Sequence, residues 1–137
     1  AEGAVIAVKL FEEPLPAEMA RMHAAMNPLW PQAGAMAQLH RAHLAVAAIP
    51  KTASLVEAAQ VLVKVVSSLC NQPSALAIDT GSTILGTDGY REGATVMKGG
   101  ELPLFNLVTF AIAKADETNF VAVTTSSRSV RPPKSPR

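Results

Sequence analysis

A chain of 137 residues fits one domain and can bury a real hydrophobic core. Hydrophobic residues make up 49% of it and charged residues only 17%, so part of the surface is expected to face a partner chain. The 12 basic and 11 acidic side chains nearly cancel, which gives no electrostatic reason to expect nucleic acid or an anionic membrane as the partner.

The sequence also predicts a cytoplasmic protein. No apolar stretch approaches the roughly 20 residues needed to span a bilayer, and the first residues lack the basic region and cleavage site of a signal peptide. The single cysteine, Cys70, cannot form an internal disulfide and fits a reducing compartment.

The first third of the chain predicts two strands separated by two helices. The segment AVIAVKLF, residues 4–11, is apolar apart from one lysine and too short for most helices, so it predicts a strand covered on both faces. Pro16 and Pro31 suit the first turns of the two helices, and Pro28 ends the first of them. The segment HLAVAAI, residues 43–49, predicts the second strand, which Pro50 closes.

Methionines and one histidine recur at helical spacing in the first of these helices, at Met19, Met22, His23 and Met26. Such a group is able to bind a soft ion such as copper(I). A stripe facing the core is the preferred interpretation, because methionine fills irregular gaps in apolar packing.

The clearest helix is predicted at residues 54–69. Ser54 and Glu57 form a capping-box pattern ahead of it, S-x-x-E. Its strongly polar side chains lie on one narrow stripe, so the helix is expected to be almost wholly buried. The residues of its expected core face are Leu55, Ala58, Ala59, Leu62, Val66 and Leu69.

The second half of the chain predicts mainly strands. Residues 75–78 read as a short strand, and residues 83–85 are able to pair back onto it across the turn DTGS. A short helix is possible at residues 90–97. LFNLVTFAIA, residues 104–113, predicts a long strand that forms a hairpin with residues 120–125.

These elements together predict an α+β sandwich. A mostly antiparallel sheet of four or five strands is expected to pack against helices, with the helix at residues 54–69 as its main partner. Residues 1–125 would form this single domain. Residues 126–137, rich in proline, arginine and serine, are expected to be disordered or draped on a surface.

Several segments, taken in order, resemble a bacterial family called domain of unknown function 4261. They are the Trp-Pro of NPLWPQA, then HRAHLAVAA, QVLVKVVSSL, PSALAI with its glycine turn, ELPLFNLVTFAIA and VTT, and they cover residues 4–125. The resemblance supports the fold and implies no function, because the family has no established activity. Its members carry a further strand and helix before the segment equivalent to AVIAV, so open sheet edges are expected here.

Asp79 is the weak candidate for a catalytic residue. The run Asp79-Thr80-Gly81-Ser82 after an apolar strand resembles the catalytic turn of aspartic proteases, whose retroviral members supply one aspartate per subunit. That chemistry requires two carboxylates sharing a proton, and therefore a homodimer. The structural alternative is a turn in which Asp79 bonds its own backbone and Gly81 supplies a positive φ.

Trp30, His40, Arg41 and His43 are the candidate binding residues. His40 and His43 are able to form a metal pair if both lie on one helix, but a helix end near residue 42 would separate them, and no carboxylate or cysteine stands nearby in the sequence. Trp30, between two prolines, is either an exposed anchor for a partner or a plug in the core. No metal or cofactor site is predicted.

The leading hypothesis is a non-enzymatic protein-binding or accessory domain that forms a homodimer. High apolar content, near-zero net charge and the lack of a catalytic constellation favour it. The alternative is a hydrolase, either a dimeric aspartic-type enzyme using Asp79 or a metal-dependent enzyme using His40 and His43.

Overall fold

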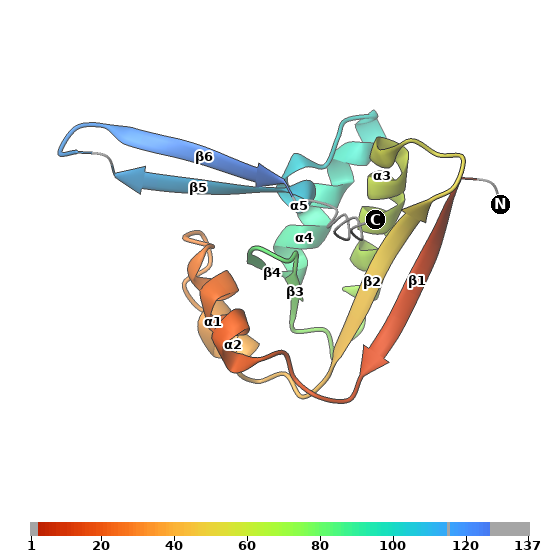
Figure 1. Ribbon diagram of the computed structural model, residues 1–137, viewed down its shortest axis with the longest axis horizontal. Coiled ribbons are helices and arrows are strands. Elements are labelled where there is room, and N and C mark those ends of the chain that lie inside the picture. The colour runs from red at the N-terminus through yellow and green to blue at the C-terminus, as the bar shows by residue number, and fades with distance from the viewer. Residues whose placement is uncertain (1–2, 115, 127–137) are drawn as a thin grey trace, which may run out of the picture.

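The chain folds as an α+β protein in a computed structural model (Figure 1). The structure describes residues 3–114 and 116–126. The elements in chain order are β1 (Ala4–Phe11), α1 (Ala17–Ala25), α2 (Ala33–Ala37), β2 (His43–Pro50), α3 (Leu55–Leu69), β3 (Ala77–Asp79), β4 (Ile84–Gly86), α4 (Thr87–Ala94), the 3-10 helix η1 (Thr95–Gly99), α5 (Leu104–Leu107), β5 (Val108–Lys114) and β6 (Phe120–Ser126).

The strands form three separate antiparallel pairs in the described residues: β1 with β2, β3 with β4, and β5 with β6. The prediction of one sheet of four or five strands is therefore wrong for the single chain. The strands themselves are largely where the sequence placed them, but each pairs only with one neighbour. Pairing with a single partner satisfies the backbone groups on one edge of each strand and leaves the other edge to tertiary contacts.

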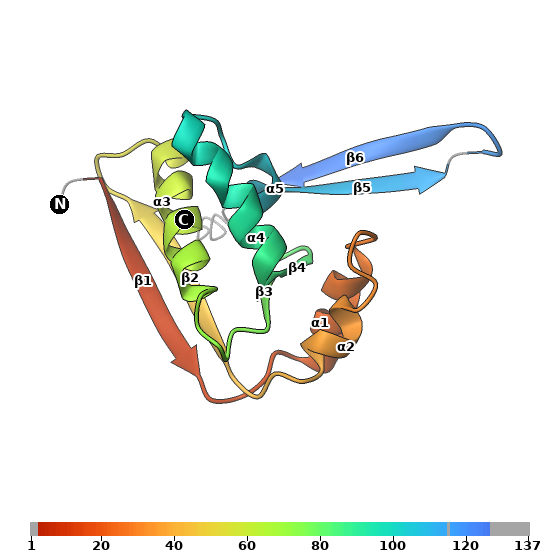
Figure 2. The same ribbon diagram turned by 180° about the vertical axis from the view of Figure 1, so that it is seen from behind.

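The small β3–β4 pair lies at the centre of the packed part of the molecule (Figure 2). Its register pairs Ile78 with Leu85 on one face, and Asp79 with Ile84 on the other. Ile84 packs with buried alanines of α1 and α2, whereas Ile78 and Leu85 pack around Val63 and Tyr90. The pair thus separates two core clusters, with α1 and α2 on one side and α3 and α4 on the other.

The β1–β2 pair is partly covered by α3 on one face, where Val8, Leu10 and Leu44 remain 54%, 58% and 48% exposed. Its register places Ile6 opposite Ala48 on the face that packs against α3, and both residues are half-buried. Val5 and Ile49 are paired on the opposite face and remain 47% and 45% exposed. The prediction of a strand covered on both faces is wrong, because no described element packs on this second face.

Helix α3 begins with the predicted capping box. The Glu57 N–H donates to the Ser54 hydroxyl at 3.2 Å, and the Ser54 N–H donates to the Glu57 carboxylate at 2.7 Å. These hydrogen bonds lower the pKa of Glu57. The helix is less buried than predicted: Leu55 is 75% exposed and is not part of the core. A sheet of two strands is too narrow to cover the first turn.

The predicted methionine stripe of α1 is also wrong in part. Met22 and Met26 are 58% and 42% exposed, whereas Ala20 and Ala24 are buried against α2. Small side chains allow the two short helices to approach closely, and the longer methionines then lie at the rim.

The long strand predicted at residues 104–113 begins instead as the short helix α5, and β5 starts at Val108. Pro103 precedes this helix. The buried Asn106 donates from its amide to the carbonyl oxygen of Tyr90 at 2.7 Å, which holds α5 against α4. Residues 127–137 of the predicted tail lie outside the described residues. No helix of the described part is long and apolar enough to cross a membrane.

Candidate functional site

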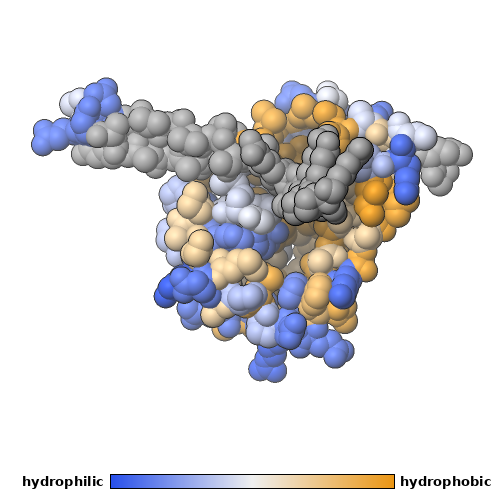
Figure 3. Space-filling view, viewed as in Figure 1, coloured by the Kyte–Doolittle hydropathy of each residue, from blue (hydrophilic) through white to orange (hydrophobic). Residues whose placement is uncertain are grey.

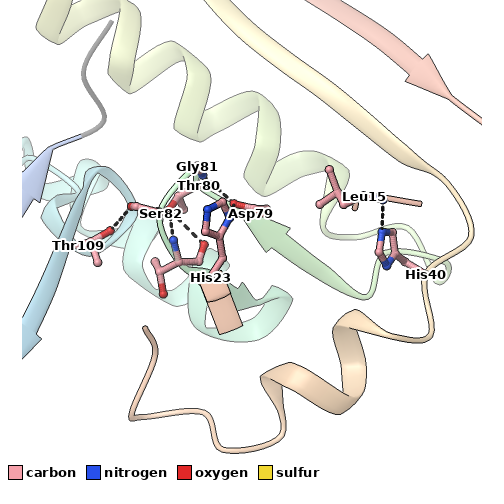
Figure 4. A network of polar contacts seen from close by, with 9 residues as sticks. Leu15, His23, His40, Asp79, Thr80, Gly81, Ser82 and Thr109 are labelled. Atoms are coloured by element: carbon pink, nitrogen blue, oxygen red, sulfur yellow. Dashed lines mark hydrogen bonds and ion pairs between the residues drawn. The ribbon is translucent and has the colours of Figure 1, made fainter. Parts of the chain in front are cut away.

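Asp79, the candidate catalytic residue, is paired with a histidine of the same chain. It ends β3 on the face toward α1, and His23 projects from α1 to meet it (Figure 4). The His23 Nδ1 lies 2.9 Å from Asp79 Oδ1 and 2.7 Å from Oδ2. Each side chain is 16% exposed, so the pair is largely shielded from water.

The turn after Asp79 has the geometry of the structural alternative. The Gly81 N–H donates to Asp79 Oδ1 at 2.7 Å, and Gly81 has a φ of 88° that a glycine adopts without strain. The backbone N–H of Thr80 donates to the carbonyl oxygen of Thr83 at 3.0 Å and closes the turn. The interpretation of residues 79–82 as a self-bonded turn is therefore confirmed.

Two hydroxyl groups extend this network toward β5. The Ser82 and Thr109 hydroxyls lie 2.5 Å apart, and Thr109 is buried at the start of β5 (Figure 4). The network therefore links α1, the β3–β4 turn and the first residues of β5. Its members lie far apart in the sequence, at residues 23, 79, 82 and 109.

The His23–Asp79 contact does not match the aspartic-type hypothesis in its present arrangement. An aspartic dyad requires a carboxylate free to face its symmetry mate, but both oxygens of Asp79 contact His23. The observed role of the His23–Asp79 pair is to fix α1 against the central hairpin.

Sequence reasoning placed His23 in a methionine stripe and did not connect it with Asp79. The two residues are 56 positions apart, and no spacing rule links a helix to the end of a distant strand. The sequence contained one signal for this contact: an aspartate ends an apolar strand. An aspartate needs a polar partner when it is shielded from water.

The predicted histidine pair is not brought together as a metal site. The His40 Nε2 accepts from the Leu15 N–H at 2.7 Å, and its Nδ1 bonds the carbonyl oxygen of Ala37. Both ring nitrogens are thus engaged, and His40 holds the start of α1 against the end of α2. In the described residues, no group of three or more possible ligands gathers around one point.

His43 lies on the uncovered face of the β1–β2 pair. Its Nδ1 donates to the carbonyl oxygen of Glu13 at 2.9 Å, and its ring stacks on Phe11 with centroids 4.7 Å apart. The Lys9 ammonium lies 4.6 Å from the centre of the Phe11 ring. Arg41, the remaining member of this motif, is exposed just before β2.

Trp30 is half-buried and packs against the cluster that contains Ile84, with its ring beside Gly86 of β4. This position matches the core plug rather than the exposed anchor. Cys70 is buried at the end of α3, and burial raises the pKa of its thiol, an effect that the nearby Arg91 partly offsets. A thiol in this state is a poor nucleophile.

Two hollows lie on the surface of the described residues. One, of about 350 Å³, runs between α1 and α2, with His40 in its wall. The other, of about 520 Å³, lies between α3 and α4, with Lys64, Arg91 and Lys98 along it. Arg91 is already bonded to Asp88 and Asn71. Neither hollow contains the His23–Asp79 pair.

The second face of the β1–β2 pair is an exposed, mostly apolar surface. We call it the sheet face; its residues are Val5, Ala7, Lys9, Phe11, His43, Ala45, Ala47 and Ile49. Figure 3 shows apolar surface gathered over β1 and β2. The sheet face carries one charged residue, Lys9, near the end where Phe11 stacks on His43.

Comparisons with known proteins find no matching family model, no similar curated protein and no similar solved structure. The resemblance to domain of unknown function 4261 therefore stays a prediction, and the fold and site described above carry the functional argument.

Proposed function

We propose that this chain is a non-enzymatic protein-binding domain that self-associates through the sheet face. The exposure of paired Val5 and Ile49 on a strand pair of eight residues each is the observation that supports it. Branched apolar side chains paired across strands stabilise a sheet chiefly when something covers them. Such a face on a small protein is typical of an interface.

A second copy is the occupant that fits this face best. The face is nearly uncharged, so two copies meet without like-charge repulsion beyond their single lysines. A twofold axis then places the same patch of each copy against the other, which is the commonest way to close such a surface. Sheets packed in this manner lie about 10 Å apart.

A charge placed on the sheet face tests the proposal. We expect the wild-type chain to be a dimer at micromolar concentration by light scattering, and Ile49→Glu to raise the dimer dissociation constant at least about tenfold, because a buried carboxylate would be desolvated. Leu29→Glu is the matched control, since Leu29 is 84% exposed in the segment between α1 and α2. A monomeric wild type, or equal effects of both variants, would contradict the proposal.

The hydrolase hypothesis has its own test. Asp79→Asn keeps the shape of the turn and removes the carboxylate. If the domain acts by binding alone, this variant keeps the dissociation constant of the wild type. Loss of a hydrolytic activity in Asp79→Asn, with association unchanged, would favour the alternative.

A further inference from the structure

We infer that the β5–β6 hairpin of one copy adds to the free edge of β1 in a second copy, and that the exchange is reciprocal. The inference rests on the proposed self-association and names the segment that completes the sheet. It would join β2, β1 and the two strands of the partner hairpin into one antiparallel sheet of four strands.

The donor in this exchange is the β5–β6 hairpin. Its strands pair from Val108 opposite Ser126 to Lys114 opposite Phe120, and both views show it projecting from the helices (Figures 1 and 2). Apart from its pairing with β6, β5 contacts α5, which directly precedes it, and Ser82 bonds Thr109 at the base. An isolated two-stranded hairpin is at best marginally stable in water.

The sequence of the hairpin favours pairing of its edges with a strand of another chain. The segments VTFAIAK and FVAVTTS contain one charged residue, Lys114, and no proline. Strand edges that face water usually carry lysine, proline or a bulge, because these features prevent pairing with another chain. In β5 and β6 the only such residue is Lys114, which ends β5.

The acceptor is the outer edge of β1. Among the described residues, β1 pairs only with β2, and α3 packs more closely on β2 than on β1. The outer edge of β1 therefore presents unpaired N–H and C=O groups over Ala4–Phe11. Its length of eight residues matches the seven of β5 and of β6, so the backbone groups on the outer edge of an added strand find partners along nearly all of it.

Addition of the hairpin extends the surface used in the proposed dimer. The edge supplies backbone hydrogen bonds, and the sheet face supplies apolar area for contact between the copies. A twofold axis allows both hairpins to be exchanged at once and leaves no hairpin unpaired.

The experiment uses the full chain with a charge placed in the middle of β5. Ile112→Asp is expected to raise the dimer dissociation constant at least about tenfold, measured by sedimentation, because a charged residue in an interstrand contact opposes pairing. Thr118→Asp, in the exposed loop at the tip of the hairpin, is the control and is expected to change it less than about twofold. The fluorescence of Trp30, which packs against the core cluster of α1 and α2, verifies that both variants keep the fold.

Hydrogen exchange of β1 then locates the contact. In the wild-type dimer, the amides of residues 5–10 that point away from β2 should exchange slowly, and Ile112→Asp should remove this protection while amides of α3 keep theirs. A dimer that is broken by Ile49→Glu but not by Ile112→Asp would overturn the hairpin exchange and leave the sheet-face contact standing. Protected β1 amides in a monomeric chain would show a hairpin closed onto its own sheet, which also overturns the exchange.

Discussion

The β3–β4 and β1–β2 strand pairs have the same antiparallel pairing and opposite environments. The strands of β3–β4 have three residues each, yet this pair separates two core clusters and is covered on both faces. The strands of β1–β2 have eight residues each, and α3 covers only part of one face. The length of a strand therefore does not decide its burial; the elements packed on its two faces do.

The difference arises from what flanks each strand pair. Helices α1 and α2 lie on one side of β3–β4 and helices α3 and α4 on the other, as Figure 2 shows. The β1–β2 pair lies at the margin, where α3 is its main described neighbour. The central pair is thus complete within one chain, whereas the marginal one presents an apolar surface for a partner.

Truncation of one isoleucine in each strand pair tests this comparison most strongly. Ile84 is 3% exposed and Ile49 is 45% exposed. Ile84→Ala should lower the free energy of unfolding by about 2–5 kcal/mol, the usual cost of emptying a packed site. Ile49→Ala should cost less than about 1 kcal/mol at a concentration where the chain is monomeric. Equal losses in urea denaturation would refute the contrast between the two regions.

A methyl group added at Gly93 tests how tightly the inner region is packed. A Cβ at this position of α4 would lie 2.6 Å from Asn106 Oδ1 and 3.5 Å from the Phe105 side chain. Gly93→Ala should therefore destabilise the fold by about 1–3 kcal/mol through overpacking.

Gly89 provides the matched control on the same helix, because a Cβ there meets no atom within 4 Å. Gly89→Ala should raise stability by about 0.5–1 kcal/mol, since alanine favours the helix and restricts the unfolded chain. Thermal unfolding of the two variants gives the comparison directly. A neutral Gly93→Ala would mean that α5 moves freely against α4.

Titration of the single tyrosine, Tyr90, measures the burial of the same inner region. Burial of Tyr90 raises its pKa to about 12, with a smaller contribution from Cys70. Because the folded pKa lies above the unfolded value of 10.0, the contribution to stability is complete below pH 10 and is lost as the pH rises toward 12. The near-ultraviolet absorbance of tyrosinate should therefore appear only close to pH 12 or with unfolding. Titration of Tyr90 near pH 10 in the folded chain would show that the core cluster around Val63 and Tyr90 is open to water.

Local signals in the sequence determined most of the elements. Ser54 and Glu57 fixed the start of α3, prolines bounded the first helices, and Gly81 marked the turn between β3 and β4. Each of these signals acts within a few residues, through a side-chain cap, a restricted φ or a positive φ. The α+β class followed from them.

Tertiary structure alone decided which strands join and which side chains meet. The pairing of His23 with Asp79 and the exposure of the sheet face depend on packing between segments that no local pattern relates. An apolar strand such as AVIAVKLF has the same sequence pattern whether its own chain covers both of its faces or leaves one face exposed. Hydrophobicity shows that a surface needs covering, but the covering element is selected by the geometry of the whole molecule.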